Sequence, residues 1–145
     1  MTGAMLVGCS LKEQPNPDPR AYAGSAADVT LEKALVDNGI KLPEDAGGVR
    51  FAVYIGADES FDLTFDTDCD TVPQFLKESS IEGSLKSSVL LPSLVETAGR
   101  EHGWNIESHR EPRGIEDDRL GAVNRSVIVA KSEGNSCKVF VSAIR

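Results

Sequence analysis

Two runs of alternating apolar residues, separated by a short polar turn, constrain the fold of this chain more than any other feature. Large apolar side chains occupy every second position from residue 49 to residue 55 and again from residue 61 to residue 65. Successive side chains of a strand point to opposite faces of a sheet, so this spacing predicts strands that each bury one face. The short connection predicts that the strands 49–55 and 61–67 pair as an antiparallel hairpin.

The C-terminal part of the chain predicts a second hairpin. Residues 126–131 and 137–144 are apolar, β-branched runs, and the polar residues 132–136 between them have the composition of a turn. Trp104 and Ile106 indicate a further short strand. We expect the charged residues 107–120 to form a long exposed loop.

The first predicted helix covers residues 30–38. Its apolar side chains recur at helical spacing, and Thr30 or Asp28 stands where an N-cap is needed. Gly39 follows at the position of a left-handed C-terminal stop.

Two further helices complete the predicted fold. Thr71 and Gln74 have the spacing of a capping box at the start of a helix over residues 71–79. Apolar residues also recur at helical spacing over residues 92–102. The elements together predict an α+β fold in which residues 29–145 form a single domain. We expect about five mostly antiparallel strands, including the two hairpins, with two or three helices packed on one face of the sheet.

The start of the chain resembles a lipobox. The residues Leu6-Val7-Gly8-Cys9 are similar to the motif at which bacterial lipoproteins are lipidated and cleaved. The resemblance implies that Cys9 carries a diacylglycerol and becomes the mature N-terminus, outside the cytoplasm and anchored to the cell membrane. Residues 1–8 would then be the truncated remnant of a signal peptide, which normally has a basic region and an apolar stretch of about 7–15 residues. A start codon further upstream, a trimmed chain and a chance match remain alternatives.

A proline-rich segment follows the lipobox. Residues 9–28 contain three prolines in alternate positions and few large apolar side chains. Such a segment buries too little apolar surface to offset its ordering entropy, and the prolines keep it extended. We therefore expect residues 9–28 to form a flexible tether between a lipid anchor and the folded domain.

The cysteine count agrees with a lipidated Cys9. The chain has three cysteines, and in an exported protein an odd count leaves one thiol to explain. Cys69 and Cys137 share the parity of the apolar residues in their predicted strands, so both would point toward a common core. If the protein is exported, we expect these two to form a disulfide. The alternative is three unrelated buried thiols in a cytosolic protein.

A wider resemblance covers roughly residues 30–80, together with the lipobox and the terminal hairpin. The runs 42–56, 61–67 and 72–79 are similar to small predicted lipoproteins of actinobacteria, in which a Leu-Pro segment leads into a strand hairpin and then a helix. The resemblance implies a location on the outer face of the cytoplasmic membrane of a Gram-positive cell. It carries over no functional residue.

The charge of the chain limits its partners. The chain has 15 basic and 23 acidic residues, a net charge of −8, and no basic run. Binding to nucleic acid through phosphate neutralisation is therefore disfavoured, as is electrostatic binding to anionic lipid. We expect membrane contact only through lipidated Cys9, and an unidentified protein or small molecule as the partner.

The sharpest metal motif is acidic. Asp66, Asp68 and Asp70 have the spacing that opens an EF-hand calcium loop, but Thr71 stands where glycine is needed and Lys77 where a bidentate glutamate belongs. A looser calcium or small-ligand site that also uses Asp62 is an alternative. We favour solvated carboxylates on a strand and near a helix N-terminus, and predict no metal or cofactor.

Catalytic motifs are weak. The two histidines, His102 and His109, would be an incomplete zinc pair, since closed structural sites need four ligands. Nucleophile-elbow and phosphate-loop motifs are missing from the sequence. We therefore predict a non-catalytic envelope lipoprotein with a binding or accessory role. The calcium module is the first alternative, and a secreted hydrolase that uses Glu101, His102 or His109 is the second.

Overall fold

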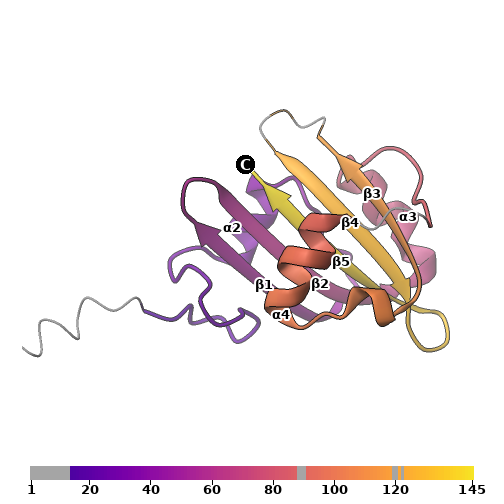
Figure 1. Ribbon diagram of the computed structural model, residues 1–145, viewed down its shortest axis with the longest axis horizontal. Helices are drawn as coiled ribbons and strands as arrows, with labels where there is room; N and C mark the ends of the chain where they lie inside the picture. Colours follow the sequence, from indigo (N-terminus) through magenta and orange to yellow (C-terminus); the bar gives the residue numbers. More distant parts are fainter. Residues whose placement is uncertain (1–13, 88–90, 119–120, 122) are drawn as a thin grey trace, which may run out of the picture.

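A five-stranded antiparallel sheet forms the centre of the protein. The computed structural model describes residues 14–87, 91–118, 121 and 123–145. The strands stand in the order β1-β2-β5-β4-β3, and every neighbouring pair is antiparallel (Figure 1). Their bounds are β1 Gly47–Ile55, β2 Glu59–Asp68, β3 Arg110–Asp117, β4 Asn124–Lys131 and β5 Ser136–Ile144. The predicted α+β class and both predicted hairpins are confirmed.

Short helices cover both faces of this sheet. The helices α2 and α3 lie on the face opposite to α4, which crosses in front of the sheet in Figure 1. The helical segments are α2 Leu31–Asp37, η1 Cys69–Thr71, α3 Val72–Glu78, η2 Ser93–Ala98, α4 Gly99–His102 and η3 Ile106–Ser108. In the described part of the chain, no helix has the length and apolar character needed to cross a membrane.

The helices lie on two faces, rather than on the single predicted face, because the central strands are apolar on both sides. Phe65 and Val139 face α2 and α3 in the larger core, whereas Ile128 and Phe140 face η2 and α4 in the smaller one. A strand buried on both faces needs a cover on each. The apolar runs in β4 and β5 are the sequence signal of this arrangement.

Strand β3 lies where the sequence predicted an exposed loop, and that prediction was wrong. Its residues Arg113 and Glu116 are exposed, because β3 is an edge strand, while Ile115 is buried in the larger core. Gly114 on its outer side exchanges two backbone hydrogen bonds with Lys86, at 2.9 and 3.0 Å. Charged side chains and a covered edge are both typical of edge strands.

The predicted short strand at Trp104–Ile106 is also absent. The structure has a left-handed residue, Asn105, followed by the 3-10 turn η3. Trp104 and Ile106 are buried there in the smaller core. The two apolar residues are therefore spaced to pack into the smaller core from a turn, and not from a strand.

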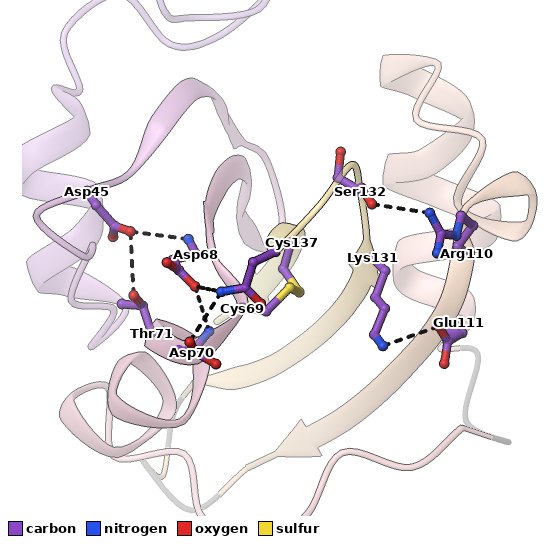
Figure 2. The surroundings of a disulfide bond; sticks show 11 residues. Asp45, Asp68, Cys69, Asp70, Thr71, Arg110, Glu111, Lys131, Ser132 and Cys137 are labelled. Atoms are coloured by element: carbon purple, nitrogen blue, oxygen red, sulfur yellow. Dashed lines mark hydrogen bonds and ion pairs between the residues drawn. A yellow bond between two sulfur atoms is a disulfide. The ribbon is translucent and has the colours of Figure 1, made fainter.

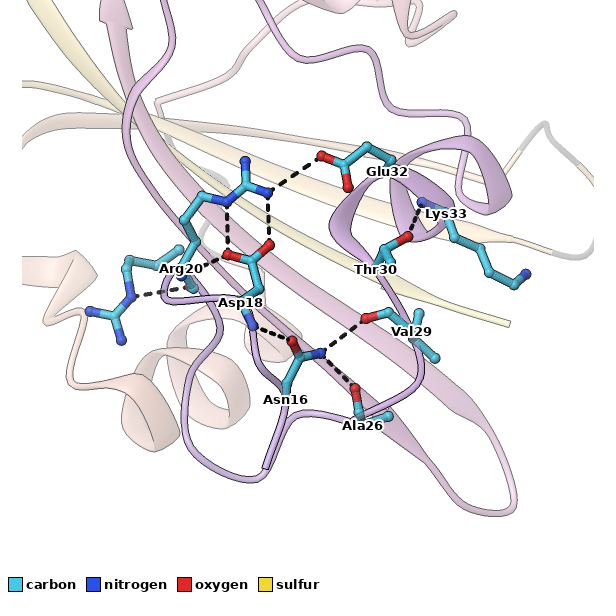
Figure 3. Close-up of polar contacts among 9 residues, drawn as sticks. Asn16, Asp18, Arg20, Ala26, Val29, Thr30, Glu32 and Lys33 are labelled. Atoms are coloured by element: carbon cyan, nitrogen blue, oxygen red, sulfur yellow. Dashed lines mark hydrogen bonds and ion pairs between the residues drawn. The ribbon is translucent and has the colours of Figure 1, made fainter. Parts of the chain in front are cut away.

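The part of the predicted tether that the structure describes packs against β1. We call residues 16–26 the N-terminal strap. The amide nitrogens of Tyr22 and Ala26 donate to the carbonyls of Phe51 and Val53, at 2.7 and 2.8 Å. Asn16 Nδ2 closes the strap by donating to the carbonyls of Ala26 and Val29 (Figure 3).

The strap differs from the expected flexible segment because hydrogen bonds hold it to β1 and because its side chains Ala21, Tyr22 and Ala26 pack against the two cores. Asp18 accepts hydrogen bonds from the backbone and the guanidinium of Arg20, which lower the pKa of Asp18. The Ser25 hydroxyl is buried and accepts from the amide of Val53. The strap thus covers the outer edge of β1. Residues 1–8, Cys9 and the rest of the predicted tether up to residue 13 lie outside the described residues.

The ends of α2 follow the prediction. Thr30 Oγ1 accepts a hydrogen bond from the amide of Lys33 at 3.1 Å, as an N-cap does. Gly39 has a φ of 65°, and the amide of Ile40 reaches back to the carbonyl of Leu35. This is a Schellman ending.

The predicted capping box of α3 was wrong. Thr71 forms no side-chain cap, and Gln74 instead bonds Glu78. The chain enters α3 through the turn η1, where Asp68 accepts from the amide of Asp70. The carboxylate of Asp68, directly before this turn, therefore serves as its N-cap.

A fully buried arginine on β4 joins both helices of the larger core to the sheet. The guanidinium of Arg125 donates to the carbonyls of Gly39, Ser79 and Ser80, which end α2 and α3. The same guanidinium pairs with Asp117 of β3 at 2.5 Å. One side chain therefore fixes two helix ends and the edge strand.

We predict that Arg125→Met lowers the free energy of unfolding by about 3–5 kcal/mol, because the Asp117 carboxylate and the helix-end carbonyls lose a buried charged donor. Urea unfolding at neutral pH measures the change. The matched control is Arg145→Met, which removes partly exposed ion pairs to Asp37 and Glu59 and should cost less than about 1 kcal/mol. Equal losses in the two variants would contradict the role of Arg125.

Candidate functional site

A disulfide joins the end of β2 to the start of β5. The Cys69 and Cys137 sulfurs lie 2.09 Å apart, and the bond spans 68 positions of the chain (Figure 2). Cys137 is buried on the same face as Val139 and Val141, as the strand parity predicted. The predicted pair is therefore the pair that the structure brings together.

The three carboxylates of the EF-hand-like motif bond to basic and amide groups of the protein. Asp66 pairs with Lys138 at 3.3 Å. Asp68 and Asp70 both accept hydrogen bonds from the side-chain amide of Asn135, in the turn between β4 and β5. Among the described residues, no group of three or more His, Cys, Asp or Glu side chains could hold a metal ion.

Asp45 is a polar residue at this end of the sheet that the sequence analysis did not single out. It accepts hydrogen bonds from the hydroxyl of Thr67, the amide of Asp68 and the hydroxyl of Thr71, and Figure 2 shows the last two. These donors, Thr67 first, lower the pKa of Asp45. Asp45 ties the loop before β1 to the η1 turn, and only the tertiary structure brings these groups together.

His102 lies in a buried polar contact with the sheet. Its Nε2 is 2.9 Å from Oδ2 of Asp62, and the side chains are only 2% and 8% exposed. The ring of Tyr22 stacks on His102 at a centroid distance of 4.1 Å, and Trp104 Nε1 donates to the Tyr22 hydroxyl. The histidine therefore joins α4, β2 and the N-terminal strap.

The other two candidate catalytic residues contact other groups. His109 Nε2 contacts the carbonyl of Trp104 at 3.0 Å, and its ring packs near Phe140. Glu101 is exposed, and its charge acts on Tyr54: burial first, and then Glu101, raises the pKa of Tyr54 to about 12. His102 and His109 contact different groups, so the structure does not bring together the zinc pair that the sequence already disfavoured.

A surface cleft opens beside the disulfide. We call it the disulfide cleft; its volume is about 770 Å³, within the usual range of small-molecule sites. It lies between α3, the loop of residues 80–85 and the edge strand β3. The lining residues on which its chemistry depends are Val72, Leu76, Lys77, Ile81, Leu85 and Arg113.

Sequence reasoning did not find this cleft. Val72 and Leu76 fall within the predicted helix 71–79, and Arg113 falls within the predicted loop 107–120. The cleft exists because residues 80–85 turn back over α3 and because β3, which pairs with β4, is bridged on its outer edge by Lys86. No local spacing in the sequence carries that information.

We predict that the double variant Cys69→Ala/Cys137→Ala lowers the free energy of unfolding by about 2–4 kcal/mol, because the unfolded chain gains the entropy of an open loop. Urea unfolding with and without dithiothreitol measures this. The reductant should destabilise the parent protein and leave the double variant unchanged. Two reactive thiols beyond Cys9 in the denatured, unreduced protein would contradict the disulfide.

We predict that His102→Ala releases the N-terminal strap. Loss of the contact with buried Asp62 should cost about 1–3 kcal/mol. Hydrogen exchange should speed up most at the amides of Tyr22 and Ala26, which bond β1. His109→Ala is the control, because His109 does not contact Asp62; unchanged exchange of the strap amides in His102→Ala would show that His102 does not hold the strap.

Comparisons with protein-family models, with curated proteins and with solved structures find no match to this chain. The resemblance to actinobacterial lipoproteins therefore stays a prediction.

Proposed function

We propose that this chain is a non-catalytic envelope lipoprotein that binds a protein or small molecule at the cell surface. Acyl chains on Cys9 would hold it to the outer face of the membrane. The observation that supports the proposal most is the Cys69–Cys137 disulfide. Disulfides persist mainly in oxidising compartments, and this pair leaves Cys9, at the lipobox position, as the remaining cysteine.

The N-terminal strap limits how far the domain would extend from the membrane. Asn16 is bonded to Ala26 of the strap and to Val29, two residues before α2, so a lipid anchor on Cys9 would lie seven residues before this fixed point. Seven residues reach at most about 25 Å when fully extended. The proposed anchor would therefore hold the domain close to the lipid surface.

The polar clusters favour a binding role over the two alternatives. The His102–Asp62 pair is buried under Tyr22, where a hydrolase would need it open to substrate. Asp68 and Asp70 share the amide of Asn135, and Asp66 pairs with Lys138. The disulfide cleft, by contrast, is open at the surface and combines apolar and charged side chains.

We predict that the protein is recovered with membranes of its native host and takes up labelled palmitate. Cys9→Ser should abolish the label and move the protein to the soluble fraction, because one thioether site carries the anchor. Ser10→Ala is the matched control, since it changes the neighbouring residue and leaves Cys9 intact. An unlabelled parent protein, or a Cys9→Ser variant that stays in the membrane fraction, would refute the anchor.

A further inference from the structure

The floor of the disulfide cleft is apolar. Val72, Leu76 and Ile81 line it and are at most 8% exposed, and Leu85 is half-buried at its side. Val72 and Leu76 come from α3, and the other two come from the loop that turns back over this helix. An apolar group can therefore lie on this floor, and the side of the cleft away from the floor stays open to solvent.

Two exposed cations line the same cleft. Lys77 lies in the last turn of α3, and Arg113 lies on the edge strand β3. Neither forms an ion pair or a side-chain hydrogen bond with any residue that the structure describes, and neither has a further interaction. Six other basic residues in the described part of this acidic chain are paired with carboxylates, namely Arg20, Lys33, Arg125, Lys131, Lys138 and Arg145.

The acidic residue of the cleft does not neutralise these two cations. Glu82 lies in the lining, and it already has an interaction partner of its own. Its contacts do not include Lys77 or Arg113, which have none. The cleft thus presents a local positive charge on a protein whose net charge is −8.

We propose that the disulfide cleft binds an amphipathic anion, namely an apolar chain that ends in a carboxylate or phosphate group. The apolar chain lies on Val72, Leu76 and Ile81, and the anionic group pairs with Lys77 and Arg113. A guanidinium matches the planar geometry of carboxylate and phosphate oxygens, and an ammonium adds a second charged donor. This assignment deepens the proposed binding role and rests on it.

The test uses the full chain carrying Cys9→Ser and three probes with the same alkyl chain: octanoate, octyl phosphate and octyl glucoside. Two-dimensional NMR follows the methyl signals of Leu76, Ile81 and Leu85 during each titration. We expect saturable shifts with the two anions and at least about tenfold weaker binding of the neutral glucoside, because charge-assisted hydrogen bonds are lost. A carboxylate-selective or phosphate-selective response identifies the head group within the proposed class.

Matched variants distinguish the effect of the two cleft cations on binding from the effect of the protein's overall charge. Lys77→Gln and Arg113→Gln should each weaken octanoate binding about tenfold. Arg100→Gln is the control, because Arg100 is an exposed cation of α4, on the opposite face of the sheet. The unfolding midpoint of each variant shows that it remains folded.

Equal binding of octyl glucoside and the anions, or equal losses in Arg100→Gln, would overturn the proposal. Methyl signals that do not move with any probe would overturn it as well. These outcomes are independent of the lipid anchor, which is tested by palmitate labelling at Cys9. If the protein takes up palmitate but its disulfide cleft binds none of the probes, the proposed anchor stands. Only the proposed class of ligand is then refuted.

Discussion

The buried guanidinium of Arg125 is the interaction on which the rest of the structure depends. It is fully buried, it neutralises Asp117, and it bonds the carbonyls at the ends of α2 and α3. Helix C-termini carry partial negative charge, so a cation placed there is stabilised by both helices. The arrangement has a cost, since Nε of Arg125 is buried without a hydrogen-bond partner in the described structure. It also determines where the chain leaves α3, and therefore where the loop of the disulfide cleft begins.

The two faces of the sheet are stabilised by different chemistry. On the face of α2 and α3, Arg125 and the disulfide add a buried ion pair and a covalent bond to the larger core. On the opposite face, the His102–Asp62 contact joins α4 to β2, and Tyr22 adds the N-terminal strap. On this second face, polar contacts therefore hold α4 and the N-terminal strap, which bury little apolar surface of their own. The open disulfide cleft is the place where apolar and charged groups remain available to a ligand.

Local patterns predicted the parts of the fold that local physics decides. The alternation in β1 and β2, the cap at Thr30 and the stop at Gly39 were all readable, because each needs only neighbouring residues. Strand β3 was missed because an edge strand keeps charged side chains and lacks a clear apolar alternation. The strap was missed because hydrogen bonds to the distant strand β1 hold it, and amino-acid composition carries no signal of such bonds. Of the candidate site, the sequence indicated the disulfide pair but not Asp45, Asn135 or the cleft.

The sequence by itself determined the strand faces, the α+β class and the choice of Cys69 and Cys137 as partners, because side-chain alternation sets which residues can share a core. Only the tertiary structure decided what the polar residues do. It placed His102 in contact with Asp62, and it placed the amide of Asn135 where Asp68 and Asp70 both accept hydrogen bonds from it. It also placed Lys77 and Arg113 in the lining of a cleft with an apolar floor. The physical reason is that a polar group is satisfied by whichever donor or charge folding brings within hydrogen-bond distance. That partner is often far away in the chain and leaves no trace in the local spacing.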